Sequence, residues 1–171
     1  GRWAAVFGNG YNNTEADGNV SSTGNAVLYI VDLETGELIR KLDTDAGSVG
    51  TPNGLATPTL VDYNADMVVD LIYAGDLLGN LWKFDVSSAN TAQWDSDYKS
   101  GSTPRALFTA EANQPITTQP QIAFHPDGLD GFMVYFGTGK YLEIDDNDPI
   151  AQATQAFYGI WDKNLSSLTT F

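Results

Sequence analysis

A strand pattern repeats in order along this 171-residue chain, and the repeat limits the fold more than any other feature. The stretch 57–62 (TPTLVD) is echoed 62 residues later by 119–124 (QPQIAF), and the strand-like 71–75 (LIYAG) by 133–137 (MVYFG). An earlier copy of the second pattern stands at 4–8 (AAVFG). Repetition of this kind is typical of architectures that stack one supersecondary unit several times.

Each repeat contains two further expected strands. The third strand ends in aspartate at 28–32, 81–85 and 158–162, and a fourth, outermost strand is expected at 37–43 and 105–110. These segments are rich in Val, Ile, Tyr, Phe and Trp and are joined by Gly and Asp turns, whereas helical periodicity is almost absent. The chain is therefore expected to be all-β.

Four-stranded units in series predict β-propeller blades, because a β-sandwich would not repeat a four-strand pattern in order. We expect one partial propeller domain over 1–171, with approximate antiparallel blades 1–53, 54–115 and 116–171, the first lacking its innermost strand. A partial propeller leaves apolar faces and strand edges open, so the fragment is expected to self-associate. The expected open faces carry residues such as Trp3, Ile72, Tyr73, Val134 and Tyr135.

The loop 62–70 (DYNADMVVD) carries the sharpest chemical signal. Oxygen ligands recur at positions one, three, five, seven and nine, as at the start of an EF-hand calcium loop: Asp62, Asn64, Asp66, the Val68 carbonyl and Asp70. Calcium takes about 6–8 oxygen ligands, and a short loop supplies several of them together. The pattern predicts one Ca²⁺ site in the second blade.

This loop departs from the EF-hand pattern at two positions. Position six is Met67, where glycine normally makes the turn, and position twelve is Tyr73, so the bidentate glutamate is absent. The missing glutamate fits a nine-residue loop between two strands. The alternative is an ordinary turn, because Asp and Asn are common turn residues. The corresponding loop of the third blade, 124–131, keeps too few ligands at the required spacing.

Composition excludes several classes of function. Against 22 acidic residues stand 8 basic ones, a net charge of −14, which argues against a nucleic-acid partner. The hydrophobic fraction of 42% is enough for a substantial core, yet no apolar stretch reaches the length of a membrane span. The absence of cysteine excludes disulfides and cysteine catalysis. Because the chain starts at Gly1 rather than Met, we expect a processed or excised piece.

No catalytic residue and no organic cofactor site is expected. His125 is the only histidine and precedes a proline in an expected surface turn. The acidic stretch 32–36 (DLETG) is better interpreted as a hairpin than as a glycosidase carboxylate pair. A second acidic cluster, 145–148 (DDND), is expected to be a solvated loop, since consecutive carboxylates cannot all face one ion.

Four segments carry a resemblance to a known family: 27–36 (VLYIVDLETG), 57–62 leading into the calcium loop, 73–85 (YAGDLLGNLWKFD) and 137–141 (GTGKY). They resemble the PilC/PilY-type proteins of type IV pili. The resemblance covers most of the chain. It implies a quinoprotein-like β-propeller from the C-terminal domain of a large secreted protein, at the pilus tip or outer membrane of a Gram-negative bacterium.

The resemblance also implies a non-enzymatic function. Such proteins promote pilus assembly, oppose retraction, and support adhesion and twitching motility, with pilus components and host surface ligands as partners. The family's calcium loop maps onto Asp62, Asn64, Asp66, Val68 and Asp70, and its calcium control of retraction would act through this loop.

Two other classes remain as alternatives. Quinoprotein dehydrogenases share the fold and the turn of 32–36, but those with pyrroloquinoline quinone commonly use a vicinal cysteine pair, and this chain has no cysteine. A purely adhesive, integrin-like calcium propeller would carry calcium loops in successive blades, and only one loop here keeps the ligand spacing.

Overall fold

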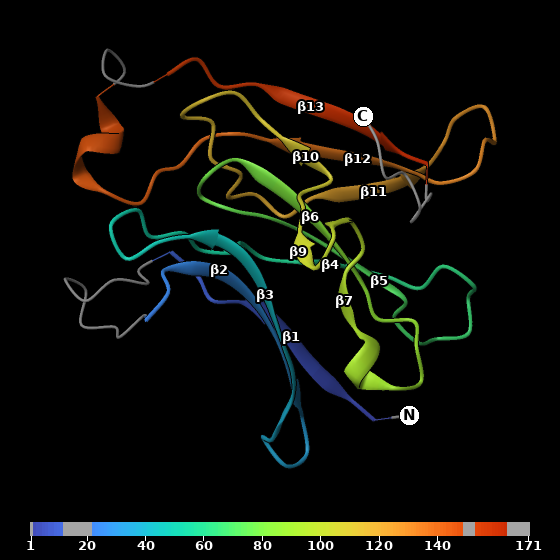
Figure 1. The fold of residues 1–171 in the computed structure, drawn as a ribbon. Helices are drawn as coiled ribbons and strands as arrows, with labels where there is room; N and C mark the ends of the chain where they lie inside the picture. The colour runs from blue at the N-terminus through green and yellow to red at the C-terminus, as the bar shows by residue number, and fades with distance from the viewer. Residues whose placement is uncertain (1, 12–21, 149–152, 164–171) are drawn as a thin grey trace.

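The computed structural model describes residues 2–11, 22–148 and 153–163, and within them three antiparallel sheets of three to five strands follow one another along the chain (Figure 1). We call these sheets blade 1, blade 2 and blade 3. Blade 1 contains β1 (Ala4–Gly8), β2 (Asn25–Asp32) and β3 (Leu38–Gly47), in that spatial order. It is drawn in blue to cyan in Figure 1.

Blade 2 is the central sheet, with the spatial order β10-β6-β5-β4. Its main strands are β4 (Thr59–Val61), β5 (Leu71–Gly75) and β6 (Asn80–Asp85). Two short strands, β7 (Asp95–Ser96) and β10 (Phe108–Thr109), pair with opposite ends of β6. The intervening chain forms a small hairpin of β8 (Lys99–Ser100) and β9 (Thr103–Pro104), and η1 (Thr91–Gln93) precedes β7.

Blade 3 is built from β11 (Gln121–Phe124), β12 (Phe132–Gly137) and β13 (Phe157–Asp162), in that order. The short 3-10 helix η2 (Ile144–Asn147) lies in the long connection between β12 and β13. The all-β, antiparallel architecture predicted from the repeat is confirmed. The outermost strand expected at 105–110 is shorter than predicted, because only Phe108 and Thr109 pair with β6 and β7 supplies the rest of that edge.

Two hydrophobic cores lie between the blades. The first joins blades 1 and 2, and its buried residues include Leu28, Leu42, Trp82 and Phe84. The second joins blades 2 and 3, and its buried residues are Val61, Leu71, Tyr73, Leu81, Ile116, Phe132, Val134 and Phe136. Side chains alternate along β5, so Ile72 belongs to the first core and Tyr73 to the second. Blade 2 therefore buries both of its faces.

This packing corrects the set of residues expected on open faces. Ile72, Tyr73 and Val134 are at most 1% exposed, because they pack between neighbouring blades. Trp3, at 86% exposure, does lie open. On blade 3, Tyr135 stacks on Phe157, which is 75% exposed, and this pair lies outside both cores.

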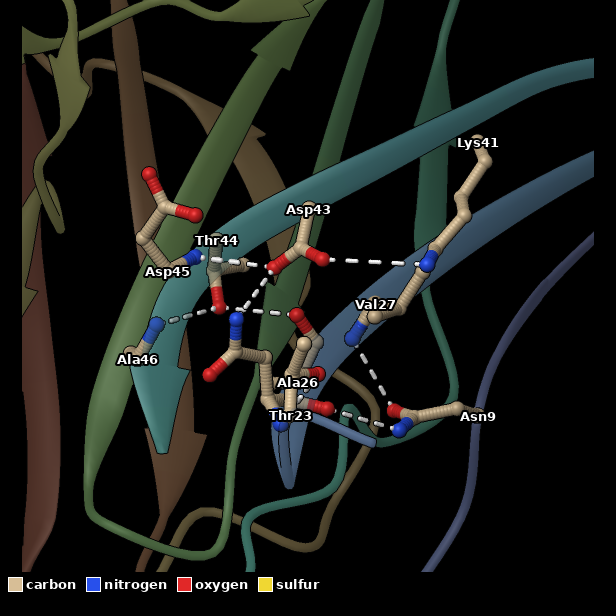
Figure 2. Close-up of polar contacts among 10 residues, drawn as sticks. Asn9, Thr23, Ala26, Val27, Lys41, Asp43, Thr44, Asp45 and Ala46 are labelled. Atoms are coloured by element: carbon tan, nitrogen blue, oxygen red, sulfur yellow. Dashed lines mark hydrogen bonds and ion pairs between the residues drawn. The ribbon is translucent and has the colours of Figure 1, made fainter. Parts of the chain in front are cut away.

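Polar side chains fix the end of blade 1 where β2 begins and β3 ends (Figure 2). The pairing of β2 with β3 shifts register between Asn25 and Val27, next to Asp45, whose φ is +56°. The Asn25 amide and the Asp45 N–H both donate to the Asp43 carboxylate, at 2.9 and 3.0 Å. Asn9 also accepts from the N–H groups of Val27 and Leu55, so this cluster joins blade 1 to the chain that enters blade 2.

Candidate metal centre

The predicted calcium loop connects β4 to β5 in blade 2. Val61 and Leu71 pair at its base, so the two strands hold its ends together. Residues 62–68 are exposed, whereas Asp70 is 8% exposed. The Asp70 N–H donates to the Val61 carbonyl at 2.9 Å, which fixes the last predicted ligand at the edge of the sheet.

The side-chain oxygens of the loop turn inward onto its own backbone. The Asp62 carboxylate accepts from the N–H groups of Asp66 and Met67, at 3.2 and 2.8 Å. Asn64 Oδ1 accepts from Asp66 at 2.9 Å, and Asp66 Oδ1 accepts from the Val68 N–H at 2.8 Å. These bonds wind the loop around the side chains predicted to be ligands.

Met67 has φ +68°, in the left-handed region that favours glycine. Its side chain is 96% exposed, so it avoids the loop interior and contributes no burial. Ala65 has φ +62°. The turn at position six therefore has the backbone conformation that glycine normally adopts, and in Met67 this conformation is sterically strained.

Replacing Met67 by glycine is expected to stabilise the folded chain by about 1 kcal/mol in the presence of calcium. Glycine relieves a steric cost of roughly 1–2 kcal/mol in the left-handed region. Its larger backbone entropy in the unfolded chain offsets about 0.5–1 kcal/mol of that gain. Urea denaturation measures the change. Met67→Ala keeps Cβ and should give no gain; equal gains in both variants would contradict the conformational explanation.

The chemistry of this donor set fits a hard cation. Three carboxylates and one amide oxygen, from Asp62, Asn64, Asp66 and Asp70, are the oxygen ligands that calcium prefers. Across residues 2–11, 22–148 and 153–163, no three carboxylate or imidazole side chains are already gathered closely enough to hold a metal ion. A cavity of about 310 Å³ lies beside the loop, and its lining includes Asn64 and Asp70 together with Asp85 and Asp97.

The corresponding loop of blade 3 is built differently. His125 closes this turn: its carbonyl accepts from the Gly128 N–H at 2.9 Å, and its Nδ1 accepts from the Asp127 N–H at 3.2 Å. The His125 ring also lies 4.6 Å from the Trp161 ring. His125 thus has a structural role in a turn.

The acidic cluster at 145–148 is not wholly the solvated loop that was expected. Asp146 is 8% exposed and accepts from the N–H groups of Leu142 and Glu143, at 2.7 and 2.9 Å, and from Lys140 Nζ at 2.9 Å. The pKa of Asp146 is lowered to about 2 by these hydrogen bonds, in decreasing order of effect from the Leu142 N–H, Lys140 and the Glu143 N–H. Asp145 remains exposed. Asp146 therefore anchors η2, and its carboxylate is fully engaged with the protein.

The predicted hairpin at 32–36 is confirmed. Asp32 Oδ1 accepts from the N–H groups of Thr35 and Glu34, and Gly36 takes φ +73°. The hydrogen bond from the Thr35 N–H, which has the larger effect, and that from the Glu34 N–H lower the pKa of Asp32. Because its carboxylate closes a turn, Asp32 is not arranged as one of a catalytic pair.

A buried charge cluster between blades 2 and 3 was missed by the sequence patterns. Lys83, on β6, is fully buried and pairs with Asp97 at 2.8 Å and with Asp162 of β13 at 3.0 Å. The hydroxyl groups of Tyr73 and Tyr98 donate to Asp162 at 2.6 and 2.9 Å. Burial, followed by the charge of Asp162, raises the pKa of both tyrosines. A lysine inside the apolar strand 81–85 was the available signal.

None of the helices within the described parts of the chain has the length and apolar character to cross a membrane.

Comparison with known proteins gives a consistent result. The family described as "PilY1 beta-propeller domain" matches residues 1–169. The chain is 40% identical to a "Type IV pilus biogenesis factor PilY1 homolog" of Xylella fastidiosa, over 95% of this chain and 11% of that protein. It is also 40% identical to the "Type IV pilus biogenesis factor PilY1" of Pseudomonas aeruginosa, over 95% of this chain and 15% of that protein. These relatives are named as pilus biogenesis factors and not as enzymes.

A solved structure matches the fold. The crystal structure of the Pseudomonas aeruginosa PilY1 C-terminal domain superposes with a TM-score of 0.78 at 38% identity. The match covers 96% of this chain and 35% of that domain. The chain therefore spans only a small part of the full-length relatives and about a third of the solved domain.

Proposed function

We propose that this chain, which belongs to the PilY1 β-propeller family, is a calcium-binding segment of a protein serving type IV pilus biogenesis. The family match along 1–169 is the observation that carries the pilus assignment. The names of the relatives support pilus components as partners and a place at the cell surface or in the envelope of a Gram-negative bacterium.

The calcium part of this proposal rests on the loop between β4 and β5. Asp62, Asn64, Asp66, the Val68 carbonyl and Asp70 would hold the ion. The left-handed backbone at Met67 supports this assignment most strongly, because methionine takes that conformation without any gain in burial. Bound calcium would offset two of the three negative charges of Asp62, Asp66 and Asp70, a structural rather than catalytic contribution.

More specific functions are proposed for this chain from its membership of the family. They comprise pilus assembly, opposition to retraction, adhesion, twitching motility and contact with host surface ligands, with the protein secreted to the pilus tip or outer membrane. Calcium binding at 62–70 would link this segment to retraction, because an ion binding there changes the charge and rigidity of an exposed loop. The exposed position of residues 62–68 supports access for the ion.

Deleting the gene that encodes this chain is expected to reduce surface pili and twitching in the parent bacterium. Reintroduction of the intact gene should restore both, and a gene carrying Asp62→Ala should restore them incompletely. Counts of sheared surface pili and twitching-zone diameters are the measurements. Glu111→Ala removes an exposed acid outside the loop and should behave as the intact gene. Normal piliation and twitching in the deletion strain would refute the pilus assignment.

Self-association of this 171-residue chain is a further part of the proposal. Phe157 of blade 3, which is 75% exposed and stacks on the partly buried Tyr135, supports it, since exposed aromatic residues on a sheet face favour association. Light scattering should give a mass above that of the monomer, and Phe157→Asp should lower it. Tyr141→Asp, at another exposed aromatic, is the matched control. A strictly monomeric chain at high concentration would contradict this expectation.

A further inference from the structure

One aromatic contact connects the candidate calcium loop of blade 2 to blade 3. Tyr63, the second residue of the loop, meets Phe132 of β12 edge to face, with ring centroids 5.8 Å apart and planes at 83°. Phe132 is 4% exposed and belongs to the core between blades 2 and 3. Edge-to-face pairs of this geometry contribute to packing beyond their buried area.

The backbone of Tyr63 is held by a proposed calcium ligand. Asp70 Oδ2 accepts from the Tyr63 N–H at 2.8 Å, across the base of the loop. Val61 and Leu71, which flank the loop, are buried in the same core as Phe132. The conformation of the loop and the packing of blade 3 therefore depend on some of the same residues.

We infer that calcium at this loop strengthens the docking of blade 3 on blade 2 through Tyr63, an inference that rests on the proposed calcium site. An ion that orders the loop fixes Asp70 and, through it, the backbone of Tyr63. Less conformational entropy is then lost when the Tyr63 ring packs on Phe132. Coupling of this kind is reciprocal, so docking of blade 3 also tightens calcium binding.

Hydrogen exchange measured with and without calcium tests this coupling. In the intact chain, calcium should slow exchange of the β12 amides by about 5- to 150-fold, the usual range of such coupling. Tyr63→Ala should still bind calcium in titration calorimetry but lose most of the calcium-dependent protection of β12. Because Tyr63 is 52% exposed and is not itself a core residue, its truncation removes the contact with Phe132 but no buried side chain of the core.

Two further variants complete the test. Tyr63→Phe keeps the ring and should retain the protection. Tyr29→Ala removes a tyrosine that stacks on Phe7 in blade 1, and it should leave the effect on β12 unchanged.

The outcomes separate the coupling from the site on which it rests. Calcium binding without altered β12 exchange would overturn the coupling and leave the calcium site standing. Equal protection in Tyr63→Ala and the intact chain would show that this contact does not carry the coupling. Absence of calcium binding to the intact chain would overturn the proposed site itself.

Discussion

Replacing Lys83 by methionine is expected to destabilise this chain by about 3–5 kcal/mol, the usual cost of breaking a buried ion pair from one side. Lys83 is fully buried, and the side chains of its partners Asp97 and Asp162 are 6% and 0% exposed. Methionine has a similar length and keeps the apolar stem packed. The loss therefore reports the two carboxylates left without their cation, not a cavity.

Equilibrium urea denaturation measures this loss, and an exposed ion pair supplies the matched control. Lys99 pairs with Asp95 at 2.7 Å, but the two side chains are 35% and 43% exposed. Solvent screens such a pair, so Lys99→Met should cost no more than about 1 kcal/mol. Equal losses for the two variants would contradict the view that burial makes the Lys83 ion pairs more important to stability than an exposed pair.

Calcium at about 100 times its dissociation constant is expected to stabilise the chain by roughly 2.7 kcal/mol, because the ion binds only the folded loop. For a domain of this size that free energy corresponds to an increase in Tm of about 5–10 °C. Calorimetry should give one calcium per chain. Magnesium should have a weaker effect, since it requires a tighter octahedral geometry.

Loop variants test whether this increase comes from residues 62–70. Asp62→Ala should abolish the calcium-dependent increase in Tm, and so should Asp70→Ala. Each change also removes loop hydrogen bonds, from Asp66 and Met67 to Asp62 or from Tyr63 to Asp70, so the increase is measured against the calcium-free form of the same variant. Asp127→Ala, in the corresponding turn of blade 3, should respond to calcium as the unmodified chain does. An unchanged increase in both loop variants would place the ion elsewhere.

The repeat was sufficient to predict the strands because the β-branched and aromatic residues typical of strands recur within short local segments. The segments 4–8 and 71–75 are strands with the predicted bounds, and 133–137 differs by one residue at its start. The edge of blade 2 was less predictable. There β7 pairs with one end of β6, the chain then forms the β8–β9 hairpin, and β10 pairs with the other end of β6. An edge formed by two such short strands has no regular alternation of apolar and polar residues in the sequence.

The candidate site was also predictable as a set of positions, because its ligands lie within nine consecutive residues. The left-handed backbone conformation of Met67 could not be predicted from the sequence. Its side chain disfavours a left-handed turn, and only the hydrogen bonds of the assembled loop, including that from Met67 N–H to Asp62, hold it there.

The class of fold, the order of the strands and the composition of the loop could all be predicted from local patterns of residues. Tertiary structure decided which faces are buried and which charges meet. Asp85 and Asp162 end equivalent strands, yet Asp85 pairs with Leu71 and is only partly buried, whereas Asp162 pairs with Phe132 and is fully buried. Asp85 pairs with the residue four positions before Gly75, whereas Asp162 pairs with the residue five positions before the equivalent Gly137. This difference of one residue in register places Asp162 on the opposite face of its blade. There it meets Tyr73, 89 residues away, and no local pattern contains a contact across that distance.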